Sequence, residues 1–329
     1  MQRIISGVAA FLSLASVAID AGAQGKTQES GYPNRPIRLI VPTPPGGSTD
    51  SVARILANKL SDIFRQQIVI DNRGRAAGIL ATELVAKAAP DGYTLLFAYA
   101  SHTTTPLLTR DKLPYDPASD FVAITLTTTQ PLVLTANAAL PVSSVKELIA
   151  LAKAKPDQLR VGAPGIGGSG YMAAELFKFE TRTSITTVVY NGGAPTQIAL
   201  VQGDVHFVFA TTSAAMPQIK AGKIKVLATS SPKRLSYLPE VPTFDEVGMP
   251  ALSLSPWQGI LAPAKTPRAV VDKLYRAVVT ALKDPDTLQR LAATGSDPQG
   301  TTPEEFTAKI KKELDYYGRV IKAANIKIN

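Results

Sequence analysis

Short apolar runs alternate with segments of helical spacing along the first third of the chain. Residues 36–42 predict a buried strand, and residues 50–65 then place apolar side chains at helical intervals. Residues 67–71 predict a second strand, 76–89 a second helix and 94–100 a third strand. This order favours a mostly parallel sheet with helices on both faces.

The same alternation restarts in the middle of the chain, after an extended segment at 122–135 that we expect to leave the first sheet. The elements predicted there are strands at 160–163, 185–190, 205–209 and 224–229 and helices at 170–179, 195–202 and 214–221. An extended segment at 252–261 is expected to return to the first sheet. The helical part that follows ends in a helix whose apolar stripe we expect to dock on that sheet. The stripe consists of Phe306, Ile310, Leu314, Tyr317 and Ile321.

Two crossings between two alternating regions indicate two α/β lobes joined by a hinge of two chain segments. We expect lobe I to contain residues 35–129 and 252–329, and lobe II to contain residues 130–251. The chain has 329 residues, of which 45% are hydrophobic and 19% charged. It is therefore long enough for two domains of ~150 residues, and general disorder is excluded.

The first residues have the pattern of a secretory leader. Arg3 precedes the uncharged run Ile4–Ile19, and Ala21-Gly22-Ala23 supplies the small residues that signal peptidase recognises. We therefore expect a signal peptide over residues 1–23 and a loose tail over 24–34. A retained N-terminal membrane anchor is the alternative interpretation.

Composition excludes several kinds of site. The chain has no cysteine, which excludes a disulfide scaffold, thiolate zinc sites and thiol catalysis. Its two histidines, His102 and His206, are too few for a multi-histidine metal site, and we expect neither a metal nor a cofactor. The net charge is +9, but the cations are scattered among acidic residues. We therefore expect no nucleic-acid binding, whereas an acidic ligand suits this charge.

Two glycine-rich segments occupy matching positions, each between a predicted strand and a predicted helix. Glycine lets backbone N–H groups approach a ligand, and a helix N-terminus adds unpaired donors and a positive dipole end. The pair predicts a cleft that binds an anion from both sides; ordinary helix capping by Ser48, Asp50 and Ser169 is the alternative. The candidate ligand-binding residues are Pro45, Gly46, Gly47, Ser48, Thr49, Asp50, Gly165, Gly167, Gly168, Ser169 and Gly170.

Two alternative functions, dinucleotide binding and hydrolysis, have less support in the sequence. Residues 165–170 spell G-x-G-x-x-G, but the next predicted strand ends without the acidic residue that a dinucleotide site needs. A secreted hydrolase could use Ser169 or Ser101 with His102, although the G-x-S-x-G elbow is missing because Tyr171 stands two residues after Ser169. Ser101 and His102 follow the third strand, at the same sheet edge as the first glycine segment, so His102 could instead donate to a ligand carboxylate.

Several ordered motifs resemble the Bug family, the periplasmic substrate-binding receptors of tripartite tricarboxylate transporters. The similarity looks continuous from about Tyr32 to Ile326. The motifs that carry it are Pro44–Asp50, Ala88–Leu96, Lys112–Pro117 followed by Asp120-Phe121, Ala221–Ala228 and Leu238–Thr243. Together they are far more specific than any one of them alone.

The resemblance implies a two-lobe type II periplasmic-binding-protein fold, a Venus flytrap. It also implies a non-enzymatic receptor in the periplasm that captures a small carboxylate for membrane permease subunits. The two glycine segments would then be the pincers on the ligand. Many members carry Phe-Asp-Asn where this chain continues from Phe209 with Ala210-Thr211-Thr212. We therefore expect a carboxylate without an amine, with Thr211 or Thr212 facing it.

The identity of the carboxylate stays open at this stage. Tricarboxylates, aliphatic dicarboxylates, aromatic acids and hydroxy acids all fit two loops that recognise one carboxylate group. A signalling receptor would use the same cleft, and the sequence does not separate it from a transport receptor. We expect a monomer.

Overall fold

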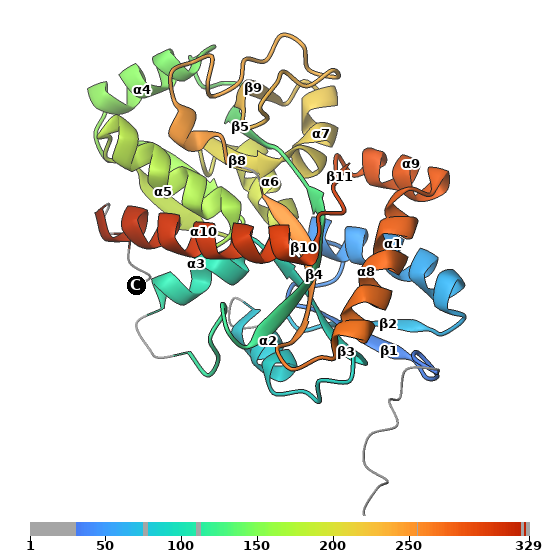
Figure 1. Cartoon of the computed structure of the whole chain (residues 1–329). Coiled ribbons are helices and arrows are strands. Elements are labelled where there is room, and N and C mark those ends of the chain that lie inside the picture. The colour runs from blue at the N-terminus through green and yellow to red at the C-terminus, as the bar shows by residue number, and fades with distance from the viewer. Residues whose placement is uncertain (1–30, 75–77, 110–112, 255, 324–325, 327–329) are drawn as a thin grey trace, which may run out of the picture. The chain divides into compact units, whose positions relative to one another are not determined.

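Strands and helices alternate in two separate sheets, which confirms the predicted α/β class (Figure 1). The computed structural model describes residues 31–74, 78–109, 113–254, 256–323 and 326. The predicted signal peptide, residues 1–23, lies outside the described residues. All the strands and helices belong to the unit of contacts that begins at Pro33.

The first sheet has the strand order β11-β4-β10-β3-β1-β2. Its parallel part consists of β1 (Ile37–Val41), β2 (Ile68–Asn72) and β3 (Thr94–Tyr99). β10 (Trp257–Pro263) runs antiparallel between β3 and β4 (Phe121–Thr129), and the short β11 (Asp297–Pro298) pairs with β4. The three parallel strands lead into α1 (Ser48–Phe64), α2 (Ile79–Ala86) and α3 (Ser101–Leu108), while α8 (Arg268–Leu282) and α9 (Pro285–Ala293) come later in the chain.

The second sheet has the order β7-β6-β8-β5-β9. In it β6 (Arg160–Ala163) is parallel to β7 (Thr186–Val189) and β8 (Phe207–Thr211), and β5 (Leu132–Asn137) is antiparallel to β8 and β9 (Ile224–Thr229). The parallel strands lead into α5 (Ser169–Thr181), α6 (Gly193–Gln202) and α7 (Thr212–Lys220). The helix α4 (Val145–Ala154) and a short 3₁₀ turn (Pro250–Leu252) complete this region.

The chain changes sheet twice. It passes from β4 to β5 through Gln130 and Pro131, and it returns to the first sheet at the start of β10. The exact lobe boundaries stay a prediction, but both changes of sheet fall in the extended segments that the pattern assigned to crossings.

The C-terminal helix α10 (Pro303–Ala323) divides its apolar stripe between two clusters of buried side chains. Phe306 and Ile310 pack with Trp257 and other residues of the first sheet, as expected. Tyr317 and Ile321 instead join the cluster that contains Phe177 of the second-sheet region. The expectation of docking on the first sheet alone is therefore corrected. The helix lies beside α3 (Figure 1), whose Leu108 belongs to the same cluster as Tyr317 and Ile321.

Helix α3 follows the third strand, at a position where the sequence pattern predicted no element. Its sequence is Ser-His-Thr-Thr-Thr-Pro-Leu-Leu, with Pro106 inside the helix. Threonine restricts χ1 and is a poor helix former, so local pattern does not predict this helix. Tertiary contacts stabilise it: residues 101–105 are all buried, and Thr103 Oγ1 donates to Glu313 of α10 at 3.0 Å. Among the described residues no helix has the length and apolarity that crossing a membrane requires.

Candidate functional site

Each predicted glycine-rich segment joins the carboxyl end of a parallel strand to the start of a helix. We call residues 43–50 loop 1 and residues 164–170 loop 2; they precede and open α1 and α5. Gly47 and Gly168 occupy the N-cap positions, with φ of −80° and −70°, and neither helix has a side-chain cap. Ser48 and Ser169 are thus the first helical residues rather than caps. Within the described residues, no capping side chain accepts from the first-turn N–H groups of either helix, which is the condition for binding an anion there.

Asp50 holds loop 1 in place. Its carboxylate accepts hydrogen bonds from Gly46 N at 2.9 Å, Arg54 Nε at 3.0 Å and Asn72 Nδ2 at 2.9 Å. The residue is 3% exposed. Burial alone raises the pKa of this carboxyl, but the hydrogen bonds from Arg54, Gly46 and Asn72 outweigh it and lower the pKa below its usual value. Asp50 therefore organises the backbone around Gly46, which has φ +83°.

Ser48 links loop 1 to both chain crossings. Its Oγ donates to Oε1 of Gln130 at 2.5 Å, and the buried Gln130 side chain donates in turn to Ser296 Oγ at 2.6 Å. The backbone N–H of Gln130 donates to the carbonyl oxygen of Pro256 at 2.9 Å, which joins the outgoing crossing to the returning one. Gln130 and Ser296 were not predicted, because 166 positions separate them in the sequence.

Loop 2 lies against α3. Thr104 Oγ1 donates to the carbonyl oxygen of Gly167, and a methyl group added at Gly167 would lie 2.8 Å from Thr105 Oγ1. Gly167 also has φ +72°, so both its conformation and its contact favour glycine. Since α3 follows β3 of the first sheet, this contact brings loop 2 of the second sheet beside the first. Thr104 and Thr105 were missed because their helix was not predicted.

Gly170 and Gly165 shape loop 2 in different ways. A Cβ at Gly170 would lie 2.5 Å from the carbonyl oxygen of Phe209, so α5 can approach β8 closely only with glycine there. Gly165 has φ +107° with open space around it. Pro45, Gly46 and Gly47 of loop 1 are exposed, whereas Thr49 is buried.

The two predicted threonines lie at the end of β8 but in different surroundings. Thr212 is buried, and its Oγ1 donates to the carbonyl oxygen of Pro131 in the crossing at 3.0 Å. Thr211 is half-buried and its hydroxyl lies 3.3 Å from that of Ser213. Thr212 is thus engaged within the chain, and Thr211 is the less buried member of the pair.

His102 is buried in α3, with 5% exposure, next to Ser101. Its Nε2 lies 3.0 Å from the carbonyl oxygen of Pro117, and its ring makes an edge-to-face contact with Phe121. Burial lowers the pKa of His102 to about 4, and the hydrogen bond with Pro117 opposes this only in part. A carbonyl oxygen can only accept, so Nε2 carries the proton and Nδ1 is an acceptor. The neutral ring therefore keeps no N–H for a ligand carboxylate.

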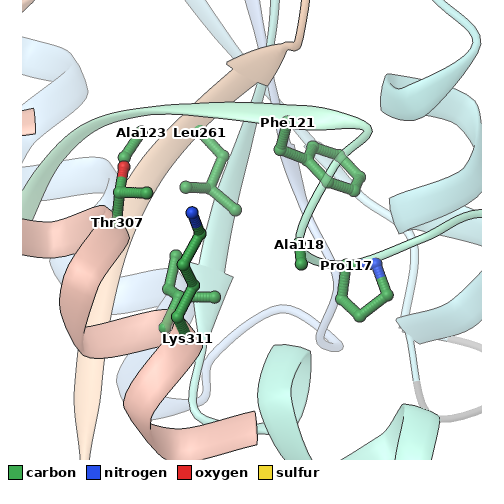
Figure 2. Close-up of a pocket in the computed structure, with 8 residues that line it drawn as sticks. Pro117, Ala118, Phe121, Ala123, Leu261, Thr307 and Lys311 are labelled. Atoms are coloured by element: carbon green, nitrogen blue, oxygen red, sulfur yellow. The ribbon is translucent and has the colours of Figure 1, made fainter. Parts of the chain in front are cut away.

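The other chemistries considered from sequence find no matching geometry in the described part of the chain. His102 has no hydrogen bond with Ser101 or Ser169 there. No group of three or more His, Asp or Glu side chains is placed to hold a metal ion among the described residues. Figure 2 shows a small pocket with Pro117, Ala118 and Phe121 on one side and Thr307 and Lys311 of α10 on the other; it contains none of the predicted site residues.

Comparison with known proteins supports the resemblance seen in the motifs. A family model described as "Tripartite tricarboxylate transporter family receptor" matches residues 52–326. Protein BugT of Bordetella pertussis is 33% identical over 329 residues, which is 100% of this chain and 99% of BugT. Both matches extend over most or all of the chain.

Solved structures agree in fold. The periplasmic binding protein BugD is 32% identical with a TM-score of 0.82, over 90% of this chain and 99% of BugD. The R. palustris protein Rpa4515 with adipate is 35% identical with a TM-score of 0.84, over 90% and 99% of the two chains. These matches confirm the expected periplasmic-binding-protein fold. By family model, sequence and fold alike, the chain belongs to the tripartite tricarboxylate transporter receptor family, TctC.

Proposed function

We propose that this protein is a periplasmic receptor that binds a small carboxylate between loops 1 and 2. The observation that carries the proposal is the matched pair of uncapped helix starts, one from each sheet, at Gly47 and Gly168. The contact of Thr104 with Gly167 brings loop 2 beside the first sheet, where loop 1 also lies.

Backbone amides supply most of the recognition in this proposal. The ligand carboxylate accepts from N–H groups of residues 47 and 48 in loop 1 and of residues 167–169 in loop 2, while the Gly46 N–H stays with Asp50. Each helix terminus adds about 0.3–1 kcal/mol of favourable interaction with an anion. Asp50 acts indirectly, because its oxygens already accept from Gly46, Arg54 and Asn72. The remaining predicted residues, Pro45, Thr49, Gly165 and Gly170, set the backbone path of the two loops.

The ligand carries no amine in this proposal. Ala210, Thr211 and Thr212 offer no carboxylate to an ammonium group at the end of β8. Adipate, present in the structure of the relative Rpa4515, is a dicarboxylate without an amine and is consistent with this reading. Thr211 supplies a hydroxyl at this position, while Thr212 stays with Pro131.

Membership in the receptor family supports the cellular role. The leader at residues 1–23 exports the chain to the periplasm, and the receptor, a monomer, delivers its ligand to the permease subunits of a tripartite tricarboxylate transporter. Lobe I (35–129 and 252–329) and lobe II (130–251) close about the crossings at Gln130-Pro131 and before β10. The protein binds its ligand without changing it.

Thermal unfolding of the protein recovered from the periplasm tests this function. We expect one or more members of a panel of mono-, di- and tricarboxylates to raise the melting temperature by about 5–10 °C at ~100-fold excess over Kd. Amino acids should not. Intact mass reports whether the leader ends at Ala23. If no carboxylate shifts the transition, and mass spectrometry of the denatured protein finds no bound acid, carboxylate binding is refuted.

Two glycine substitutions distinguish the role of loop 2 in ligand binding from an effect on general stability. A Cβ at Gly168 would lie 3.7 Å from its nearest neighbour, the Gly165 carbonyl oxygen, so Gly168→Ala fits the fold. We expect it to weaken ligand binding at least tenfold because the methyl group crowds the bound carboxylate. Gly318→Ala in α10, where an added Cβ would meet nothing closer than Leu107 Cδ2 at 3.9 Å, is the matched control and should bind as the wild type does. Equal affinities for the two variants would contradict the role of loop 2.

A further inference from the structure

A small cavity with several polar side chains lies against α3. Residues from β3, α3 and the segment before β4 line it, chiefly Tyr99, Ser101, His102, Thr105 and Tyr115, together with Pro42. The cavity has a volume of about 10 Å³, which is room for about one small polar group.

Two buried polar atoms of residues that line this cavity have no hydrogen-bond partner in the described part of the chain. They are Nδ1 of His102, whose residue is 5% exposed, and Oγ1 of Thr105, whose residue is 2% exposed. The two residues are three positions apart in α3 and so lie on the same helix face. A buried polar atom without a partner costs about 1–3 kcal/mol, which a bound group with matching hydrogen bonds would recover.

The missing partner has a defined chemistry. His102 donates through Nε2 to Pro117, so Nδ1 can only accept and requires a donor. The Thr105 hydroxyl can donate, so it suits an acceptor. None of the residues that line the cavity is Lys, Arg, Asp or Glu, and burial raises the pKa of Tyr115 to about 12, so the tyrosine stays neutral. A carboxylate would place its lone pairs against Nδ1 without a cation to balance it. An alcohol hydroxyl both donates and accepts.

The cavity adjoins both loops. Pro42 precedes loop 1 directly, and Thr105 Oγ1 lies 2.8 Å from the position of a Cβ on Gly167 in loop 2. A ligand whose carboxylate sits on the loop amides therefore needs to extend only a short way to reach His102 and Thr105.

We propose that the cavity under α3 is a hydroxyl subsite, so that the receptor prefers hydroxycarboxylates to the same acids without the hydroxyl. The ligand hydroxyl donates to His102 Nδ1 and accepts from Thr105 Oγ1. This inference rests on the proposed carboxylate-binding function and names the ligand class within it.

Calorimetric titration with matched acids tests the subsite. The pairs are succinate with malate, and butyrate with 2-, 3- and 4-hydroxybutyrate. We expect at least one hydroxy acid to bind the wild type about tenfold more tightly than its partner. Thr105→Val, which keeps the side-chain shape without the hydroxyl, should remove that preference. Thr105→Ser, which keeps the hydroxyl, should retain it. Thr181→Val, at a buried threonine of α5 whose hydroxyl donates to Phe177, is the matched control and should retain it too.

The outcomes separate the two proposals. Binding of none of these acids to the wild type, with no shift in the broader panel, would refute the receptor function itself. Equal binding within every pair, or a preference that survives Thr105→Val, would overturn the hydroxyl subsite and leave carboxylate binding intact. An ordered water that stays in the cavity of the ligand-bound crystal structure would also overturn it.

Nitrogen NMR gives a second measurement that needs no folded variant at position 105. The chain has two histidines, so the imidazole spectrum is simple, and His206 is distinguished by the Arg160 N–H that donates to its Nδ1. We expect the His102 Nδ1 signal to move on addition of the preferred hydroxy acid and to keep its position with the acid that lacks the hydroxyl. Identical spectra with both acids would count against the subsite.

Discussion

Replacing Asp50 by asparagine tests how loop 1 is held. The carboxylate accepts from Gly46 N, Arg54 Nε and Asn72 Nδ2 at 2.9–3.0 Å, and the residue is 3% exposed. Asparagine has the same shape but a single accepting oxygen. Its NH₂ group must therefore face at least one of these donors, which is left without an acceptor.

The expected cost follows from these contacts. One buried donor without an acceptor costs about 1–3 kcal/mol, and the lost ion pair adds little because the Arg54 side chain is 51% exposed. We expect Asp50→Asn to lower the free energy of unfolding by about 2–3 kcal/mol. That corresponds to a fall in melting temperature of roughly 4–10 °C. Ligand affinity should fall as well, because the Gly46 amide loses its anchor.

The pH dependence of the free energy of unfolding provides a second test of the role of Asp50. The pKa of Asp50 is lower in the folded protein than the ~3.9 of an unfolded aspartate. Its stabilising effect is thus fully present above that unfolded value and is lost as the pH falls through the folded pKa. Urea unfolding of wild type and Asp50→Asn from pH 7 to pH 3 should show a difference that shrinks only below about pH 4.

Asp286→Asn is the matched control for this experiment. Asp286 pairs with Arg290 on α9 and its side chain is 67% exposed, so its loss should change stability by less than about 0.5 kcal/mol. Equal effects of the two substitutions, or an Asp50 effect that is constant down to pH 3, would refute the account of loop 1.

Three further predictions concern separate contacts. The folded-state pKa of His102, about 4, lies below the unfolded value of ~6.5, so stability should fall by up to roughly 3 kcal/mol between pH 6.5 and 4, and His102→Gln should remove most of this fall in pH-dependent urea unfolding. Gly170→Ala places a methyl group 2.5 Å from the Phe209 carbonyl oxygen and should lower the melting temperature by several degrees, as calorimetry would show. Ser48→Ala removes the donor to Gln130 and should cost about 1 kcal/mol in urea unfolding.

Each of these has a matched control. His206→Gln, at a less buried histidine, should remove less of the acid-induced loss. Gly318→Ala meets no atom closer than Leu107 Cδ2 at 3.9 Å and should be milder than the substitution at Gly170. Ser51 lies three residues after Ser48 in α1, and its hydroxyl donates to the carbonyl oxygen of Gly47. Ser51→Ala should lower the free energy of unfolding by less than Ser48→Ala does. A control that matches or exceeds its partner would contradict the contact assigned to that partner.

The sequence predicted those parts of the fold that local pattern determines. Strand β1 and helix α1 follow from an apolar run and a helical stripe, and the glycines of loops 1 and 2 identify the strand-to-helix turns. Helix α3 could not be predicted, because its threonines are poor helix formers and contacts such as Thr103 with Glu313 stabilise it. The site residues that the sequence analysis missed, Thr104 and Thr105, belong to this helix.

Side-chain pairing at long sequence distance was equally hidden. Nothing in the sequence distinguishes Gln130 within the crossing. Its hydrogen bonds with Ser48 and Ser296 are known only from the structure. The tautomer of His102 depends on the Pro117 carbonyl oxygen, 15 residues away, and only that contact turns an expected donor into an acceptor. Pattern along the chain indicates which residue types are available, whereas the direction of each hydrogen bond depends on tertiary neighbours.

Helix α10 constrains any movement between the two sheets mechanically. Phe306 is fixed among first-sheet side chains and Tyr317 among those of the second-sheet region, and a helix keeps these anchors about 16 Å apart. With the two crossings, the helix makes a third attachment between the halves. A body tied at three points turns freely only about a line through them all, so the lobe closure proposed above requires one attachment to yield. Either the contacts around Phe306 or those around Tyr317 must shift in that closure, and we expect the helix to limit how far the cleft can open.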